Sequence, residues 1–315
     1  MFKVTITTSD AMYEPAVLSG LTWETVRKST PGKLKFSVMS DPSMTIPEGS
    51  VVKAYDGETG FFWGYVFTTQ TTGDGKIDIT AYDQLRYFKN KDSRSYKSKT
   101  ADALLKTIAK DYGLSVGKCD ATGIALTRVE DDEELFGMME NAIYDTLTAT
   151  SKLYVLYDDF GKLRLSDFTT MEIPILIGDK TSGGYTYTSS IDGETYNRIK
   201  LAYTDSNSDK KTYFVSEDTS TQKKWGLLQK YEKINSLEGA QIRADSMLKL
   251  YNTPVRTLKF RDCFGDIRVR AGSCVLTRLS QDAGYNYMLV EKATHRISDG
   301  VHLMDLTLKG GVVNG

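Results

Sequence analysis

The two histidines are the residues whose type and spacing come closest to a catalytic or metal-binding pair. His295 and His302 flank Asp299-Gly300, a dipeptide that favours a tight β-hairpin turn. If this dipeptide forms the turn, His302 pairs with Ile297. His295 then pairs with Met304, so both imidazoles share one face as diagonal neighbours, about 7–8 Å apart. A metal would need further ligands from other strands. We therefore interpret the pair as packed or interface histidines and keep metal binding as the less favoured alternative.

Asp159-Phe160-Gly161 spells the metal-binding motif of protein kinases. A kinase also needs a Gly-rich phosphate loop, a lysine on a suitable strand and a catalytic loop, and we find none of these in the sequence. We therefore expect a turn between a strand that ends at Tyr157 and a strand that begins at Lys162.

Two charged segments are further candidates. The acidic run Glu130 to Glu134 offers carboxylates of the kind that glycosidases use. Because the run precedes a predicted helix, we interpret it as a solvated helix start that the helix dipole favours. The basic segment 86–99 interleaves lysines and arginines with aromatic residues such as Tyr87, as single-strand nucleic-acid sites do. It joins a strand to a capped helix and contains Asp92, so we expect a charged inter-domain connection or a contact surface for an acidic partner.

The common motifs for nucleophiles, phosphates and dinucleotides are missing from the chain. The sequence contains no G-x-S-x-G elbow, no P-loop and no G-x-G-x-x-G. We therefore predict a protein that is not an enzyme, without catalytic, cofactor-binding or metal-binding residues and without a cofactor. Turnover of peptidoglycan or muropeptides that is lost in a Glu133→Gln variant would contradict this prediction.

Length and composition define the class of protein. A chain of 315 residues is too long for one ordinary core and indicates two or three domains. The formal net charge of -1 lacks the basic excess typical of nucleic-acid binding. Cys119, Cys263 and Cys274 are odd in number and show no CxxC spacing, which predicts free thiols. We find no signal peptide and no apolar run near the ~20 residues of a membrane span, which predicts synthesis in a cytosol.

Periodic patterns divide the chain into units. Alternating apolar residues with turn dipeptides between them predict small β-barrels near both ends. Helical patterns, the first capped by Thr100, predict an α/β unit between the barrels. The predicted domains are a first β-barrel, 1–95; an α/β middle domain, 96–190; a second β-barrel, 191–311, with a helical insertion near 236–252; and a flexible tail, 312–315. The fold class is therefore α+β and β-dominated, with two related small, tube-like β-barrels.

A weak internal repeat links the two predicted barrels. Gly49-Ser50 opens a segment that ends in a hairpin at Asp74-Gly75, and Gly272-Ser273 opens one that ends at Asp299-Gly300. The strands after the two turns match by position. Because order, spacing and turn chemistry agree, we favour a duplicated barrel over two unrelated strand–turn–strand segments.

Several short stretches, each weak alone, occur in an order and spacing that are fairly specific. They are Gly49 to Val66, Ala81 to Tyr87, Asn197 to Lys200, Trp225 to Gln229, Ala271 to Ser273 and His302 to Leu306. Through them nearly the whole chain resembles the XkdQ/YqbQ-type hub proteins of phage and prophage contractile tails. Members of this family are similar in fold to the central hub of myophage baseplates and to the N-terminal part of type VI secretion spike proteins.

The resemblance implies a structural baseplate hub of a phage tail or an R-type bacteriocin, present in the assembled particle. It implies a homotrimer that joins a six-fold tail tube to a three-fold central spike and contacts other baseplate proteins, with no specific nucleic-acid binding and no catalytic residues. A trimer can present six similar surfaces if each chain carries two copies of one. Two alternatives stay open: a β-scaffold glycosidase or peptidase that processes cell walls for a phage tail, and an oligonucleotide-binding barrel. The missing nucleophile counts against the first alternative, and the near-zero charge counts against the second.

Overall fold

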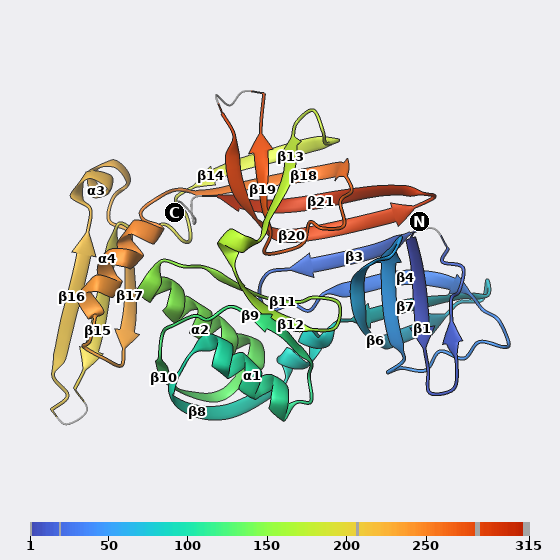
Figure 1. Ribbon diagram of the computed structural model, residues 1–315. Helices are drawn as coiled ribbons and strands as arrows, with labels where there is room; N and C mark the ends of the chain where they lie inside the picture. The colour runs from blue at the N-terminus through green and yellow to red at the C-terminus, as the bar shows by residue number, and fades with distance from the viewer. Residues whose placement is uncertain (1, 19, 206–207, 281–283, 311–315) are drawn as a thin grey trace.

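The computed structural model describes residues 2–18, 20–205, 208–280 and 284–310 of the chain (Figure 1). Strands dominate, with helices confined to the middle of the chain and to one insertion, as the predicted β-dominated α+β class requires. A single 13-stranded sheet contains strands from both ends of the chain.

The first half of this sheet, β1–β7, is built from strands with alternating apolar residues. Val4 and Ile6 of β1, together with Leu34 and Phe36 of β4, face one buried core, because successive strand residues point to opposite faces. Asp74-Gly75 forms the β6–β7 turn, as expected, with Gly75 at a φ of 78°. The strands are β1 (Phe2–Thr7), β2 (Met12–Tyr13), β3 (Leu21–Val26), β4 (Lys33–Met39), β5 (Val51–Asp56), β6 (Thr59–Thr71) and β7 (Lys76–Tyr82).

The second half of the sheet has its own core, formed around Phe260, Val290 and Met304. Its strands are β13 (Glu172–Gly178), β14 (Gly184–Ser190), β18 (Val255–Phe264), β19 (Cys274–Arg278), β20 (Asn286–Ser298) and β21 (Val301–Gly310). The sequence placed residues 172–190 in the middle domain, but β13 pairs with β19 and β14 pairs with β18. Pairing across 65 or more residues leaves no local pattern, so the boundary at 190 could not be read from the sequence.

The two halves repeat one strand order. The first half runs β3-β4-β7-β6-β5, and the second runs β14-β18-β21-β20-β19. Corresponding strands therefore have the same neighbours, which agrees with the repeat predicted from the two Asp-Gly hairpins. The halves differ at one end, where β1 joins β5 antiparallel and β13 joins β19 parallel. Strand β20 also pairs with β3, and this seam makes the halves one continuous sheet.

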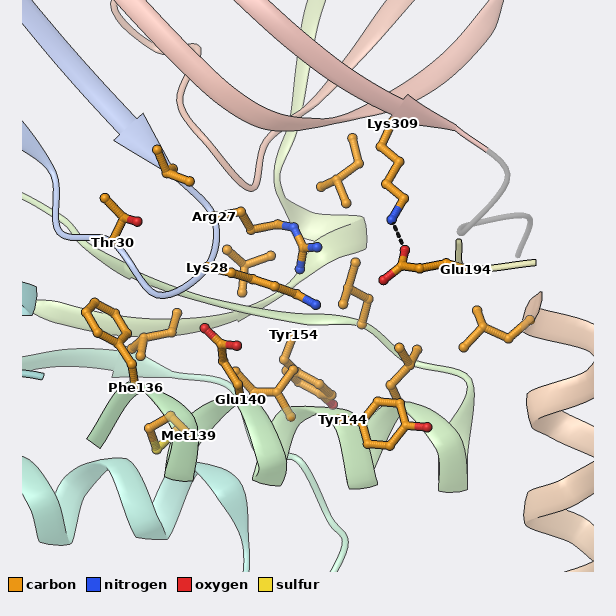
Figure 2. Close-up of a pocket in the computed structure, with 18 of the residues that line it drawn as sticks. Arg27, Lys28, Thr30, Phe136, Met139, Glu140, Tyr144, Tyr154, Glu194 and Lys309 are labelled. Carbon is orange, nitrogen blue, oxygen red and sulfur yellow. Dashed lines mark hydrogen bonds and ion pairs between the residues drawn. The ribbon is translucent and has the colours of Figure 1, made fainter. Parts of the chain in front are cut away.

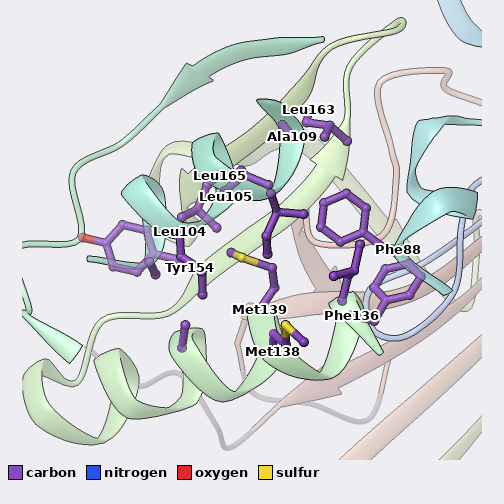
Figure 3. Close-up of a cluster of buried hydrophobic side chains, with 14 of the residues drawn as sticks. Phe88, Leu104, Leu105, Ala109, Phe136, Met138, Met139, Tyr154, Leu163 and Leu165 are labelled. Carbon is purple, nitrogen blue, oxygen red and sulfur yellow. The ribbon is translucent and has the colours of Figure 1, made fainter. Parts of the chain in front are cut away.

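A compact middle unit follows β7. Thr100 caps its first helix by accepting a hydrogen bond from the Ala103 N–H at 3.4 Å, as expected. Figure 3 shows Phe88, Leu105 and Met139 pointing into the core between its helices and strands. The elements are the 3-10 helix η1 (Gln84–Lys89), β8 (Lys91–Lys99), α1 (Ala101–Asp111), β9 (Val116–Cys119), β10 (Leu126–Glu134), α2 (Leu135–Thr150), β11 (Tyr154–Asp158), β12 (Leu163–Asp167) and the 3-10 helix η2 (Phe168–Thr170).

An insertion module, residues 198–251, separates β14 from β18. It comprises β15 (Arg198–Thr204), β16 (Lys211–Glu217), α3 (Thr219–Trp225), β17 (Gln229–Ile234) and α4 (Ala240–Tyr251). Helix α4 lies where the helical insertion was predicted, although it begins at Ala240 because Gly239 has a φ of 67°. The module is larger than the sequence indicated: β15–β17 form a separate three-stranded sheet and take no part in the second half. Ile199 and Leu201 pack there against Met247 of α4. The predicted tail, 312–315, lies outside the described residues.

Candidate functional site

The histidine hairpin has the register that its turn chemistry predicted. His302 lies opposite Ile297, and His295 lies opposite Met304. The two rings contact each other, since His295 Nδ1 and His302 Nε2 are 2.9 Å apart. His295 Nε2 lies 2.8 Å from the carbonyl oxygen of Val269. A carbonyl only accepts, so His295 donates through Nε2 and its Nδ1 accepts the hydrogen bond from His302.

The histidine pair lies at the seam between the two halves of the sheet. His295 is fully buried and stacks on Trp23 of β3 with ring centroids 4.9 Å apart. Burial lowers the pKa of His295 to about 3, and the neighbouring imidazole of His302 adds to this shift. Burial also lowers the pKa of His302. Among the described residues no group of three or more His, Cys, Asp or Glu could hold a metal ion. The geometry is that of packed histidines, in which His295 of β20 stacks on Trp23 of β3.

Asp159-Phe160-Gly161 forms the turn between β11 and β12, as expected. Phe160 and Gly161 have φ values of 48° and 82°, and the Asp159 N–H donates to the Lys162 carbonyl oxygen at 2.8 Å. The turn contacts the first half of the sheet. The Phe160 ring lies 5.4 Å from the Tyr55 ring and fills the space above Gly60, where a Cβ would come within 2.3 Å of it. The motif therefore docks the middle unit against β5 and β6.

A buried polar junction beside this turn was missed by the sequence analysis. The Asp83 carboxylate accepts hydrogen bonds from the backbone N–H of Gly32 at 2.9 Å and of Leu85 at 3.0 Å. The side chain of Gln84 donates to the Asp158 carboxylate at 3.1 Å. These contacts connect the β3–β4 turn, η1 and β11. The detectable signal was that Asp83 directly precedes η1, where an Asp favours a helix start.

The electrostatics of this junction depend on burial. Burial raises the pKa of Asp83, and the neighbouring Asp158 carboxylate raises it further. Burial also raises the pKa of Asp158. The Arg270 guanidinium opposes both shifts from the second half, and it lies over the Tyr157 ring at 4.4 Å. Residues from both halves and from the middle unit thus meet at one site, which suits a structural joint.

The acidic run forms part of a strand, in contrast to the helix start that we expected. Glu130 to Glu134 end strand β10, and β10 pairs with β8 from the basic segment. Lys91 forms an ion pair with Asp132 at 3.0 Å, and Ser93 donates to Asp131 at 2.7 Å. The helix begins afterwards, without a side-chain cap from Glu134. The two charged segments are therefore neighbouring strands of one β-ladder, joined by the Lys91–Asp132 ion pair, and local helix signals could not reveal this ladder.

Figure 2 shows a cavity between the β3–β4 turn, α2, β11 and the end of β21. Phe136, Met139 and Tyr154 provide apolar wall, and the ion pair between Lys309 and Glu194 lies on another side. Its volume is about 100 Å³. Pockets that bind small-molecule ligands usually measure about 300–1,000 Å³. The cavity therefore fits a few water molecules or one side chain, and an oligosaccharide or peptide substrate is too large for it.

Comparisons with known sequences identify relatives in Bacillus subtilis strain 168. The uncharacterized protein YqbQ is 29% identical over 211 residues, which cover 65% of this chain and 63% of YqbQ. The phage-like element PBSX protein XkdQ is 27% identical over 270 residues, which cover 83% of this chain and 82% of XkdQ. The alignment with YqbQ thus spans less than two thirds of that relative's length.

Solved structures share the fold at low sequence identity. The prophage MuSo2 43 kDa tail protein from Shewanella oneidensis superposes with a TM-score of 0.70 at 12% identity, over 97% of this chain and 98% of that chain. The E. coli c3393 protein, a component of the type VI secretion system, gives a TM-score of 0.55 at 9% identity, over 97% of this chain and 76% of that chain.

Family membership rests on a match across both halves of the sheet and everything between them. The family model described as YQBQ-like matches residues 21–309, from the start of β3 to the last residue but one of β21. This match agrees with the resemblance inferred from the short sequence stretches. The chain belongs to the YQBQ-like family.

Proposed function

We propose that the protein is a structural baseplate hub of a contractile phage tail or tail-like particle. In this role it joins a six-fold tail tube to a three-fold central spike as a homotrimer. Membership of the YQBQ-like family supports a tail role, since the relative XkdQ is a protein of a phage-like element. The shared fold with a prophage tail protein supports it as well. The protein would be made in the bacterial cytoplasm and end in the particle.

The repeated strand order is the observation that carries this proposal. Each chain presents two units with the same five-strand order, joined edge to edge by β20 and β3. Three chains would supply six such units, so a three-fold assembly could match a six-fold partner. A chain with a single unit could match only one of the two symmetries.

The remaining parts of the chain are positioned for other contacts. Figure 1 shows the middle unit and the insertion module outside the shared sheet. The module exposes Tyr213 and Tyr231 on its sheet, each 47% accessible to solvent. Tyrosine is enriched at protein–protein interfaces because its ring is apolar and its hydroxyl stays hydrated. We assign these parts to contacts with neighbouring baseplate proteins.

The proposal includes no catalytic role. The histidines, the Asp159-Phe160-Gly161 turn and the acidic run each make contacts that explain them structurally. Incubation of the pure protein with peptidoglycan should therefore give no soluble products. Hydrolysis that a Glu133→Gln variant abolishes would instead support the cell-wall-processing enzyme.

The stoichiometry of the assembled tip tests the hub proposal. Coexpression of the protein with its tail tube protein and its central spike protein should give a complex with three copies of this chain, measured by native mass spectrometry. A structure of the tip should show six repeated units at one radius. Six separate copies around the axis, or two units of one chain at different radii, would contradict the proposal.

A further inference from the structure

Strand β14 is an edge without the usual protection. Among the described residues it pairs only with β18 and so ends the sheet. Its sequence, Gly184–Ser190, contains no charge and no proline, although such residues commonly protect an edge from pairing with another chain. Tyr185 and Tyr187 lie on it with 39% and 45% of their surfaces exposed. The strand therefore has the features of an edge that receives a partner.

The repeat shows how a strand in the position of β14 is covered in the other half of the sheet. In the first half, β3 occupies the place that β14 occupies in the second, since β3 pairs with β4 as β14 pairs with β18. Trp23 of β3 corresponds to Tyr187, because each lies opposite a core residue of the next strand, Leu34 or Leu258, that aligns with the bulge shared by β6 and β20. Trp23 is only 3% exposed. The difference arises because β20 covers the edge of β3, whereas no described strand covers β14.

A strand that could cover β14 is also present. Strand β6 corresponds to β20, since both enter an Asp-Gly hairpin and both pair with the strand that follows. Residues 292–297 of β20 receive β3. The corresponding part of β6, residues 67–71, pairs only with β7 within the described structure. This segment, with the sequence FTTQT, is likewise uncharged. Each chain therefore carries two strand edges without a partner in the described structure, one along residues 67–71 of β6 and one along β14.

We propose that β14 of one copy pairs antiparallel with β6 of the next copy and so repeats between chains the seam that β3 and β20 form within each chain. This inference rests on the proposed trimer and names the contact that closes it. The seam is heterologous, because each copy offers two different edges, and such contacts close into rings when the rotation permits. Three internal seams and three such contacts would alternate around the ring.

The internal seam fixes the register of the proposed contact. Glu24 lies opposite Thr294 in the β3–β20 seam. The two halves align at a shared hydrogen-bond pattern, because Val66 of β6 bonds to the backbone of Gly49-Ser50 as Val290 of β20 bonds to Gly272-Ser273. In this alignment Glu24 corresponds to Thr188, and Thr294 corresponds to Gln70, as the ladders to the neighbouring strands show. Thr188 should therefore lie opposite Gln70 of the next copy.

The same correspondence places the exposed tyrosine. His295 lies opposite Trp23 in the internal seam and corresponds to Thr71. Tyr187 should then lie opposite Thr71 of the next copy. Aromatic and β-branched residues directly opposite one another are favourable cross-strand pairs, and the new strand would cover the exposed face of the tyrosine.

A disulfide between chains tests this register. The variant Thr188→Cys/Gln70→Cys, assembled with the tube and spike proteins and mildly oxidised, should run as a covalent trimer on a non-reducing gel and return to monomer with reductant. Residues directly opposite in adjacent strands lie within the reach of a disulfide, about 4.4–6.8 Å between Cα atoms. The matched control Thr188→Cys/Thr68→Cys moves one cysteine two residues along β6 and should cross-link at least tenfold less.

The outcomes separate this inference from the hub proposal. Native mass spectrometry of the unoxidised assembly reports the copy number independently of the cysteines. Three copies with no covalent trimer, or with equal cross-linking in both variants, would overturn the β14–β6 register and leave the trimeric hub standing. A complex without three copies would overturn both. The wild-type protein, with its own three cysteines, should form no covalent trimer under the same conditions.

Discussion

At the scale of single residues, the histidine pair couples stability to pH. Burial lowers the pKa of His295 to about 3, whereas a histidine in an unfolded chain titrates near 6.5. The unfolded state therefore binds more protons below pH 6.5, and the free energy of unfolding falls as the pH drops towards 3. Between pH 6.5 and 5 we expect His295 to account for a loss of about 2 kcal/mol. Urea unfolding at a series of pH values measures this loss.

A matched substitution isolates the histidine contribution. Glutamine at position 295 keeps an N–H donor for the Val269 carbonyl oxygen but does not titrate. His295→Gln should be less stable than the wild type at pH 7 and should lose less stability between pH 6.5 and 5. An unchanged pH dependence would show that other groups dominate the acid sensitivity.

The three cysteines should differ in reactivity while all remain thiols. Burial raises the pKa of Cys263 to about 12 and of Cys274 to about 11, and both side chains are buried. Cys119 is partly exposed, and burial raises its pKa as well. Thiol titration of the native protein at pH 8 should modify Cys119 first. Denaturation without reductant should expose three thiols per chain, whereas a single reactive thiol would indicate a disulfide.

At this scale, a contact could be predicted from the sequence only when its partners lie close together along the chain. The histidine register was predictable, because one Asp-Gly turn sets the alignment of both strands. The junction of Asp83 and Asp158 was not, since the bond from Gln84 to Asp158 joins residues 74 positions apart. Burial of a carboxylate depends on such distant partners, and no local pattern records them.

At the scale of elements, the β11–β12 hairpin holds the middle unit against the first half of the sheet. Phe160 at its tip packs on Tyr55 and over Gly60. Phe160→Ala removes this ring, and because the side chain is only partly buried we expect a loss of about 2 kcal/mol in the free energy of unfolding, below the ~3–5 kcal/mol of a fully buried phenylalanine.

Two measurements check the role of the hairpin. Urea unfolding gives the change in stability, and limited proteolysis should cut the Phe160→Ala variant faster within residues 158–163. Phe160→Leu keeps much of the apolar contact and should lose less than half as much stability. Equal stability of Phe160→Ala and the wild type would mean that the turn does not fasten the two units together.

Elements with strong local signals were predictable, and elements defined by their partners were not. Helix α1 follows its Thr100 cap, and the β11–β12 turn follows its Gly161. The acidic residues of β10 favoured a helix start by local criteria, but pairing with the basic strand β8 decided their conformation. Likewise the allocation of β13 and β14 to the second half depends on ladders to strands far along the chain.

At the scale of the whole molecule, the sequence indicated the repeat but did not indicate which strands join the two repeated units. The matching hairpins indicated two related units. The seam between them is formed by β3 and β20, which are separated by most of the chain. Only this seam shows how one unit presents an edge to the next, so the sequence could indicate a ring of units without indicating which strands close it.

Opposite and like charges placed across the proposed seam should control assembly. Thr188 lies on the edge strand β14, and Gln70 lies in the part of β6 that pairs only with β7, so charged substitutions there should leave the monomer folded. Thr188→Lys/Gln70→Lys would place like charges directly opposite one another between copies, which destabilises strand pairing, whereas Thr188→Asp/Gln70→Lys would place opposite charges there. The first variant should form the three-copy complex with the tube and spike proteins more weakly than the second.

The free energy of one cross-strand charge pair sets the expected difference in assembly between the two variants. A directly opposed pair changes pairing by roughly 0.2–1 kcal/mol, and three equivalent seams in one ring multiply the effect to roughly 0.6–3 kcal/mol for each sign of charge. The two variants should therefore differ by about 1–6 kcal/mol in the free energy of trimer formation. Titration of the complex at several protein concentrations by native mass spectrometry measures this difference, and circular dichroism controls for folding. Raised salt should narrow the difference, because exposed charges are screened. Equal assembly of both variants would place the contact between copies at other strands than β14 and β6.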